Sequence, residues 1–471
     1  MSTNAFKTKG YILVLVLVCA SIGVLLLGGL IRWGVTDVIA TRQMADREQA
    51  IQIAEAGIDY YRWHLAHAPL DFMDGTATSG PYVHAFHDKD GNVIGDFTLQ
   101  IVPPPLGSTL VIVTATGRTL GGVQRSVRVQ FAKPSIAKYA VVANSMMRFG
   151  AGTEVFGPVH SNQGLRFDGI AHNLVTSGVA TYDDPDHTGA NEYGVHTHDS
   201  PTDALPPAAV SPRTDIFEIG RTFPVPTIDF GGITSDLSQL KSNAQSSGFY
   251  RPGSGSLGYH VVLKTNDTFD LYRVTSMASA PWGCTNTASQ TGWGTWSVQN
   301  QTLLGNYAFP ANGILFFEDH VFVKGQINGA RLNIVSAVLP DNAATRKNII
   351  INNDLLYTRY DGTDTIGLIA QGNVLVGMVS ENDLRIDAAL IAQNGLVGRL
   401  YYESDCSPYD DRSTITLWGM IATNVRYGFA YTDNSGYQTR NINYDGNLLY
   451  SPPPGFPLTG DEYVTVLWEE I

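Results

Sequence analysis

The chain has 471 residues, so its length alone allows two or three domains or one long repetitive β-structure. Only 15% of the residues are charged, whereas Gly is abundant and aromatic residues reach 10%, a mixture typical of strands joined by tight turns. The 43 acidic and 30 basic residues give a net charge of −13, which would repel nucleic-acid phosphates, so we expect no nucleic-acid partner.

The first predicted element is an uncharged apolar helix from Tyr11 to Ile31. It would be about 32 Å long, enough to cross a bilayer. Lys7 and Lys9 precede it, so the positive-inside rule predicts a cytoplasmic N-terminus and an extracytoplasmic bulk, in the periplasm or at the cell surface. A cleaved secretory signal peptide is the alternative, but this apolar run is too long and Arg32 follows it. We therefore predict a retained single-pass membrane anchor.

Helical periodicity continues beyond the membrane, from Asp37 to His67. Its apolar stripe consists of Ile51, Ala54, Ile58, Tyr61 and Leu65. From residue 95 the period changes to two, and three strands separated by turn residues predict an antiparallel meander. We expect the stripe to cover the apolar face of this sheet, as in a small α+β module.

An internal repeat follows the predicted meander. The phrase IAQGNVLVG at Ile369 to Gly377 returns as IAQNGLVG at Ile391 to Gly398, and looser copies occupy 159–169, 351–358 and 420–428. A period near twenty predicts the coils of a parallel β-helix, in which Asn residues at the turns accept positive φ and form ladders between coils. A β-sandwich also spaces short strands regularly and is the alternative.

These patterns predict an α+β region followed by a mainly β region. We expect a short helix at Ser235 to Ser247 and a strand pair at 259–274 within an insertion. The predicted divisions are a leader (1–10), the transmembrane helix (11–31), its extension (32–68), the α+β module (69–134), first β-helix coils (135–180), the insertion (181–310), and further coils with a C-terminal tail (311–471).

Several segments resemble a known family. The leader KTKG before YILVLVLV is similar to the processing site of type IV prepilins, which are cut after a Gly. AEAGIDYYRWHL at 54–65 resembles the N-terminal segment of PilX-like pilus assembly proteins. Residues 123–134, 156–165 and 443–457 resemble exported proteins that share this N-terminus and carry a β-helical outer domain. The resemblance implies cleavage between Gly10 and Tyr11, a prepilin peptidase and pilin-like subunits as partners.

One departure from the pilin pattern bears on the role. Major pilins carry Glu at the fifth mature position, where it pairs with the N-terminal amine of a neighbouring subunit, and this chain has Leu15 there. PilX-like and tip-type members often lack this Glu. The resemblance therefore implies a minor or accessory role rather than a shaft subunit. Gly23, Gly28 and Gly29 would let another helix approach the anchor closely.

Few residues suggest bound ions or covalent links. Cys284 and Cys406 could form a disulfide in an oxidising compartment, or remain two buried thiols. The segment from Asp183 to Asp199 is rich in imidazole and carboxylate groups, which can bind a transition metal. A solvated loop is the simpler interpretation of this segment, so no metal site is assigned. The weak candidate ligands are His187, His196, His198 and Asp199.

The sequence does not require an enzyme or a cofactor. Carboxylates such as Asp319, Asp383 and Asp387, with Arg385, could line a glycan-cleaving groove of a β-helix, but Asp383 lies in a predicted turn. We therefore name no catalytic residue. Trp282, Trp293 and Trp296 could bind a glycan or surface ligand, or fill a small core of the insertion.

The predicted function is a membrane-anchored, pilin-like minor or accessory component of a type IV pilus or related secretion system. Its extracytoplasmic β-solenoid would be structural or adhesive. The alternatives are a membrane-tethered carbohydrate-active enzyme and a surface adhesin unconnected with pili.

Overall fold

The structure is a computed structural model that describes residues 9–105, 107–230, 232–459 and 462–471. Residues 1–8 of the predicted leader therefore lie outside the described residues. The chain forms two compact units. Unit 1 comprises Met1–Pro103, Val111–Phe131 and Thr465–Ile471, and unit 2 comprises Pro104–Leu110 and Ala132–Val464.

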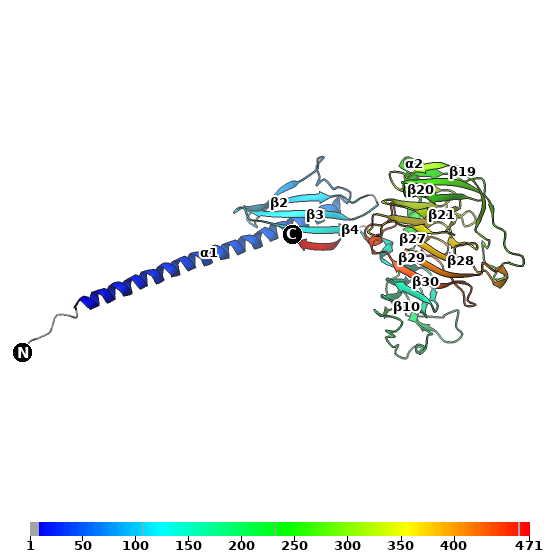
Figure 1. Ribbon diagram of the computed structural model, residues 1–471, viewed down its shortest axis with the longest axis horizontal. Coiled ribbons are helices and arrows are strands. Elements are labelled where there is room, and N and C mark those ends of the chain that lie inside the picture. Colours follow the sequence, from blue (N-terminus) through cyan, green and yellow to red (C-terminus); the bar gives the residue numbers. More distant parts are fainter. Residues whose placement is uncertain (1–8, 106, 231, 460–461) are drawn as a thin grey trace, which may run out of the picture. The chain divides into compact units, whose positions relative to one another are not determined.

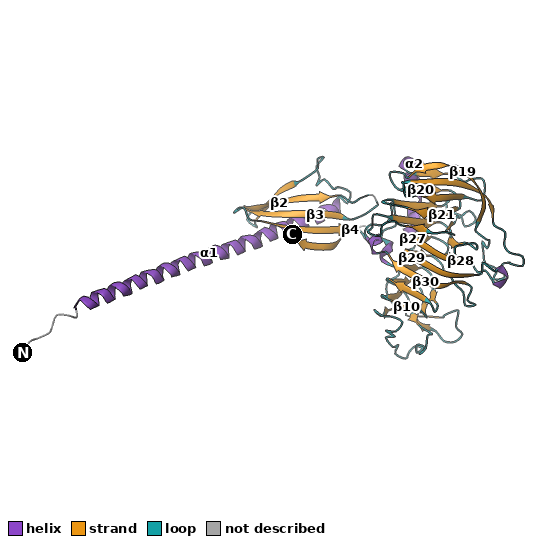
Figure 2. Ribbon diagram, in the orientation of Figure 1, coloured by secondary structure: helices purple, strands orange, loops and turns teal. Residues whose placement is uncertain are grey.

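In unit 1, a single helix, α1, runs from Lys9 to His67 without interruption (Figures 1 and 2). Its 59 residues give a length of about 88 Å. The predicted membrane helix and its predicted extension are therefore one element. The side chains of residues 11–22 are all exposed, and burial begins only near Ala50.

A small sheet with the strand order β1-β2-β3-β4-β31 completes unit 1. β1 to β4 pair antiparallel, as the meander predicts. The edge strand β31 comes from the C-terminus, where Arg128 pairs with Glu469 at 3.2 Å and the amide of Ile471 donates to Ser126. The predicted division 311–471 grouped this C-terminal tail with the β-helix coils without assigning it a partner, and the structure pairs its last strand with β4. The strands are β1 (Tyr82–His87), β2 (Val93–Val102), β3 (Val111–Thr119), β4 (Gln124–Ala132) and β31 (Val464–Glu470).

The C-terminal half of α1 packs on this sheet. The predicted stripe is correct except at Ile51, which is only half-buried, because the buried face is centred on Ile53 and Ala54. The contact is close at Gly117 of β3, where an added Cβ would lie 2.1 Å from the carbonyl oxygen of Ala50. The buried helix residues are Ala50, Ile53, Ala54, Ile58, Tyr61 and Leu65, and they face Phe97, Leu99, Val113, Ala115, Val127 and Val129.

Unit 2 is mostly β-structure, in one large, mainly parallel sheet, a three-stranded sheet of order β14-β9-β6 and the strand pair β12-β13. Its first strands are β5 (Val141–Ala143), β6 (Met147–Phe149), β7 (Thr153–Phe156), β8 (Val159–Ser161), β9 (Leu165–Phe167), β10 (Ile170–Ala171), β11 (Val175–Ser177), β12 (Thr181–Tyr182), β13 (Glu192–Tyr193), β14 (Val195–His196) and β15 (Arg221–Thr222). The others are β16 (Phe249–Arg251), β17 (Tyr259–Leu263), β18 (Thr268–Met277), β19 (Val298–Ala308), β20 (Ile314–Phe317), β21 (Val321–Gln326), β22 (Arg331–Ser336), β23 (Ile349–Ile350), β24 (Leu355–Leu356), β25 (Thr365–Ala370), β26 (Val374–Val376), β27 (Asp383–Ala392), β28 (Val397–Arg399), β29 (Asp411–Thr423) and β30 (Gly436–Tyr444).

The internal repeat lies in register between neighbouring strands. Ile369 of β25 is opposite Ile391 of β27, and Val374 of β26 is opposite Val397 of β28. Both pairs of strands are parallel, whereas a β-sandwich is built from antiparallel strands. The repeat therefore marks successive layers of one parallel stack.

A continuous apolar ladder runs through the interior of this stack. Equivalent positions of eight successive parallel strands carry buried aliphatic side chains, each contributing about 1.5–3 kcal/mol when removed from water. Because each layer covers the next, the core extends along the whole stack. The ladder residues are Leu315, Ile334, Leu368, Leu390, Ile421, Val141, Val159 and Val175.

The order of strands along the stack differs from their order in the chain. β29 pairs with β5, and β30 pairs with β7, so the residues after Val141 continue the stack beyond its C-terminal strands. Figure 1 shows this order, with the teal β10 beyond the orange β30 and the green β20 at the opposite end. The chain then returns to that opposite end, where β16 pairs with β20.

The predicted insertion is partly wrong, because it contributes strands to the same sheet. β16 and β17 pair in parallel with β20 and β21, and β15 pairs with β11. The expected hairpin is β17 and β18. The expected helix is α2 (Gly232–Ser247), whose Leu237, Leu240 and Ala244 cover an outward apolar ladder that includes Phe316 and Ile369. Three short 3-10 helices complete the described elements: η1 (Ile136–Lys138), η2 (Ser404–Cys406) and η3 (Gly446–Leu449).

The predicted Asn ladder is present at one edge of the stack. The Nδ2 of Asn144 donates to the Oδ1 of Asn424 at 2.9 Å, and the Nδ2 of Asn162 donates to the Oδ1 of Asn144 at 2.9 Å. None of these three residues has positive φ, whereas Asn434, at a turn outside this ladder, has a φ of 68°. The amides instead satisfy polar groups between layers.

We predict that Gly117→Ala destabilises unit 1 by about 1–3 kcal/mol, because the new methyl group would collide with the backbone of α1. Gly121→Ala is the matched control, since a Cβ there meets only ordinary contacts at 3.7 Å. Urea unfolding of the full-length protein in detergent measures both changes. Equal stability of the two variants would contradict the close packing.

Candidate functional site

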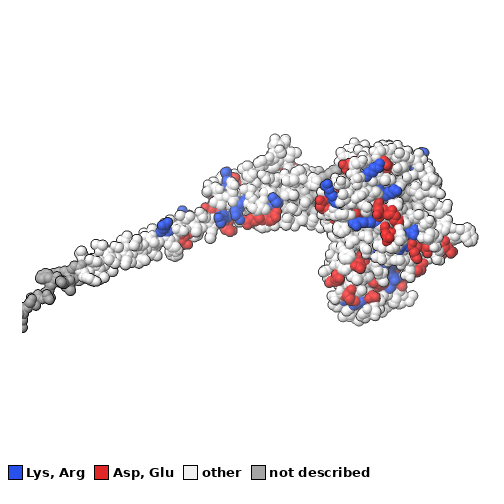
Figure 3. Space-filling view, in the orientation of Figure 1, with Lys and Arg blue, Asp and Glu red and all other residues white. Residues whose placement is uncertain are grey.

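The most distinctive surface of the chain is the N-terminal part of α1. It is long and apolar enough to cross a membrane, and none of its apolar window is buried in the described structure. Figure 3 shows this part of the helix free of charged side chains, whereas acidic and basic residues mix on unit 2. This pattern is consistent with a single-pass membrane anchor.

The residues predicted to process and pack this helix lie on an open surface. Tyr11 is 82% exposed. An added Cβ at Gly23, Gly28 or Gly29 would meet nothing within 4 Å. Gly10 lies in the first turn of α1. Cleavage at Gly10 and helix packing at the other glycines remain predictions.

A polar cluster occupies the segment that was singled out as a weak metal candidate. Asp184 follows β12, Glu192 begins β13, His196 ends β14, and His198 lies two residues further on. β12 and β13 pair antiparallel, while β14 pairs in parallel with β9 in a separate three-stranded sheet of order β14-β9-β6. These two pairings bring the four side chains together, with their donor atoms all within 4.8 Å of one another. We call Asp184, Glu192, His196 and His198 the donor cluster.

The donor cluster is buried, unlike the solvated loop of the simpler interpretation. The side chains of His196 and Asp184 are 2% and 4% exposed. The Nε2 of His196 lies 3.5 Å from the Oδ2 of Asp184, and it also contacts the Oε2 of Glu192. The Nε2 of His198 lies 2.9 Å from the Oε1 of Glu192. Four nitrogen and oxygen ligands therefore point at one small volume.

The electrostatics of Asp184 follow from its neighbours. Burial raises the pKa of this carboxyl, but contacts with His196, the amide of Asp186 and the guanidinium of Arg166 outweigh burial and lower the pKa below its usual value. Asp184 therefore stays ionised at neutral pH. Its Oδ2 is 3.6 Å from the Nη1 of Arg166, beyond the usual length of a hydrogen bond.

Two of the predicted metal candidates lie at the margin or elsewhere. His187 is 43% exposed and contacts the Oε1 of Glu192 at 2.9 Å from outside the donor cluster. Asp199 faces Arg213 at 3.7 Å and is not part of the cluster. Sequence reasoning placed Asp184 and Glu192 in this polar segment but did not choose them as ligands, because the pairing of β12 with β13 is what brings them together.

The candidate catalytic carboxylates do not converge. Asp387 is buried and accepts hydrogen bonds from Arg385, the amide of Tyr357 and the hydroxyl of Tyr360. Asp319 instead accepts hydrogen bonds from the amide and hydroxyl of Ser254 and pairs with Lys347, and neither of these residues is among the described partners of Asp387. Asp387 therefore anchors the loop that contains Tyr357 and Tyr360 through hydrogen bonds.

The tryptophans and the outward cysteines belong to one region. Cys284 and Cys406 form a disulfide that links positions 122 residues apart. Trp293 and Trp296 pack against the small apolar cluster around this disulfide, whereas Trp282 is fully exposed. The small-core interpretation therefore holds for two of the three tryptophans.

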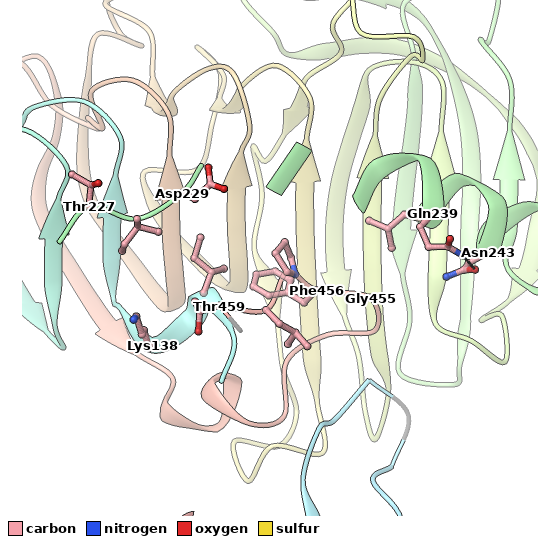
Figure 4. Close-up of a pocket in the computed structure, with 13 residues that line it drawn as sticks. Lys138, Thr227, Asp229, Gln239, Asn243, Gly455, Phe456 and Thr459 are labelled. Atoms are coloured by element: carbon pink, nitrogen blue, oxygen red, sulfur yellow. Dashed lines mark hydrogen bonds between the residues drawn. The ribbon is translucent and has the colours of Figure 1, made fainter. Parts of the chain in front are cut away.

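A pocket of about 630 Å³ lies beside α2 (Figure 4). Gln239 and Asn243 approach it from α2, and Asp229 from the preceding segment, while Phe456 lines it from the C-terminal side. Among the described lining residues Asp229 is the one carboxylate, whereas glycoside hydrolysis needs two. The described lining of the pocket therefore offers no pair of carboxylates.

Comparisons with known proteins give little further information. No protein-family model and no curated protein matches the chain. The solved structure of the competence-associated pilin ComZ from Thermus thermophilus is similar over 90% of this chain and 97% of its own, with 14% identity and a TM-score of 0.31. A likeness this weak carries no argument about fold or function.

We predict that replacing both Cys284 and Cys406 by Ala lowers the stability of unit 2 by about 2–4 kcal/mol, because the disulfide closes a long loop. Dithiothreitol should shift the urea midpoint of the wild-type protein and of the Cys19→Ala control, but not that of the double variant. A midpoint unaffected by the reductant in all three proteins would contradict a stabilising disulfide.

Proposed function

We propose that the chain is a membrane-anchored, pilin-like minor or accessory component of a type IV pilus or related secretion assembly. The exposed apolar segment of α1 is the observation that carries this proposal. α1 would be stored in the membrane with its N-terminus in the cytoplasm and unit 2 outside. Membrane lipid, prepilin peptidase and pilin-like subunits would be its partners.

The architecture of unit 1 supports this proposal. One helix is apolar and exposed at its N-terminal end and packs on an antiparallel sheet through its C-terminal half. Such a layout lets the same helix bind membrane or neighbouring helices while the sheet fixes its outer end. A basic leader ending at Gly10 adds the sequence feature that a prepilin peptidase would recognise.

We propose further that unit 2 is a β-solenoid with a structural or adhesive role rather than an enzyme. The support is the in-register parallel pairing from Leu315 to Val175 and the Asn ladder at one edge. A rigid stack displays a long lateral surface, which suits contact with a glycan or a protein at the cell surface. The exposed Trp282 is one group that could make such a contact.

Processing by a prepilin peptidase provides a direct test. The mature chain should begin at Tyr11 in cells that contain the peptidase, and Gly10→Val should leave the leader attached. Gly23→Val, a matched change inside the helix, should still be processed. Mass spectrometry of the intact N-terminus distinguishes these products, and a wild-type chain that begins at Met1 or near Arg32 would contradict the pilin-like part of the proposal.

Filament entry should depend on the fifth mature position. Leu15→Glu should increase the share of protein in sheared filaments, because the new carboxylate can pair with a neighbouring N-terminal amine in a medium of low dielectric constant. Leu17→Glu adds the same charge without that partner and should not increase it. Immunoblots of sheared and membrane fractions measure the difference. An unchanged distribution for Leu15→Glu would argue against assembly with pilin-like subunits.

A further inference from the structure

The donor cluster of unit 2 has a chemical composition that the proposed function does not explain. We propose that Asp184, Glu192, His196 and His198 bind one Zn²⁺ ion in a closed structural site. Two imidazole nitrogens and two carboxylate oxygens form a ligand set that suits zinc. The proposal does not depend on the role of α1.

The distances between the donor atoms lie on both sides of those in a tetrahedral site, from the close contact of His196 with Glu192 to separations within 4.8 Å. Ligands about 2.0–2.1 Å from zinc lie roughly 3.4 Å from one another in a tetrahedron. The described separations are 3.5 Å between His196 and Asp184 and 2.9 Å between His198 and Glu192. Small side-chain rotations would therefore place all four atoms on one ion without moving the strands.

Two buried atoms that make ion-pair contacts but no hydrogen bond of ordinary geometry give independent support. Within the described part of the chain, the Nε2 of His196 and the Oδ2 of Asp184 are buried and form no hydrogen bond of ordinary geometry. Both side chains are more than nine-tenths buried, and the two atoms face each other across the donor cluster. Leaving such groups unsatisfied is costly. A cation between them would satisfy both.

The surroundings of His196 prepare its Nε2 for a metal. Its Nδ1 lies 3.2 Å from the carbonyl oxygen of Tyr193, to which it can only donate. This contact uses the proton on Nδ1, so in the neutral imidazole the lone pair of Nε2 faces the donor cluster, and a cation there would take the place of the proton that Nε2 carries in the imidazolium form. Ligand histidines in metal sites are oriented in this way by a backbone carbonyl or carboxylate. The Oδ1 of Asp168 also accepts a hydrogen bond from the backbone amide of His198 at 2.9 Å, which helps to fix the position of that second histidine.

The local charge also favours a divalent cation. Asp184 and Glu192 bring two carboxyl groups into a buried volume, and Arg166, which contacts Asp168 at 2.7 Å, lies 3.6 Å from Asp184. The ion would neutralise both carboxylates. With four protein ligands no position remains for a substrate, so the ion would be structural. It would fix the β12–β13 hairpin to β14 of the three-stranded sheet β14-β9-β6.

Metal titration of the full-length, untagged protein in detergent tests the proposal. After treatment with EDTA, calorimetry at pH 7.5 should show one Zn²⁺ bound per chain. His198→Gln should weaken binding by roughly 100-fold or more, because it removes a ligand. His172→Gln is the matched control, since His172 also contacts two carboxylates, those of Glu154 and Glu218, but lies outside the donor cluster.

Two further measurements keep the test decisive. Circular dichroism confirms that each variant is folded, and Co²⁺ bound to the wild-type protein should give the strong visible absorption of a four-coordinate site even if His198→Gln does not fold. Failure of the wild-type protein to bind Zn²⁺ would overturn the proposal in favour of a cluster of histidine–carboxylate ion pairs. Equal losses in His198→Gln and His172→Gln would also overturn it.

Discussion

The surface of α1 from Tyr11 to Ile31 is the constraint on which the functional account depends. Within the helix, the backbone N–H and C=O groups form hydrogen bonds with one another. The side chains of this segment are apolar, and no other part of the described chain covers them. Water is a poor solvent for such a surface. Lipid or the helices of other membrane proteins can cover it.

Unit 2 meets a different constraint, because its edge strands must be paired or covered. Each layer of the parallel stack hydrogen-bonds to the next, so the interior ladder from Leu315 to Val175 is continuous. The Asn ladder satisfies polar groups at one edge. On the outer face, α2 covers apolar residues such as Phe316 that would otherwise contact water. The stack is thus held together by hydrogen bonds between layers, by its interior ladder and by the cover that α2 provides.

The sequence predicted local structure well and long-range pairing poorly. The helix, its stripe at Ala54 and Ile58, and the repeat at Ile369 and Ile391 follow from periodicity, and the structure has all of them. The pairing of the C-terminal β31 with the small sheet and of β5 with β29 could not be predicted, because no local pattern identifies a distant partner. The donor cluster shows the same limit. The two histidines were recognised, but Asp199 was chosen over Glu192 because their positions depend on strand pairing.

Membrane topology is the property that tests the account most directly. Intact cells, spheroplasts and alkaline-washed membranes should be compared by protease digestion, with antibodies against the extreme N-terminus and against unit 2. The account predicts that the protein stays in the alkaline-washed membrane fraction and that protease added from outside removes unit 2. Recovery of the full-length chain, with its start intact, as a soluble cytosolic protein would contradict it.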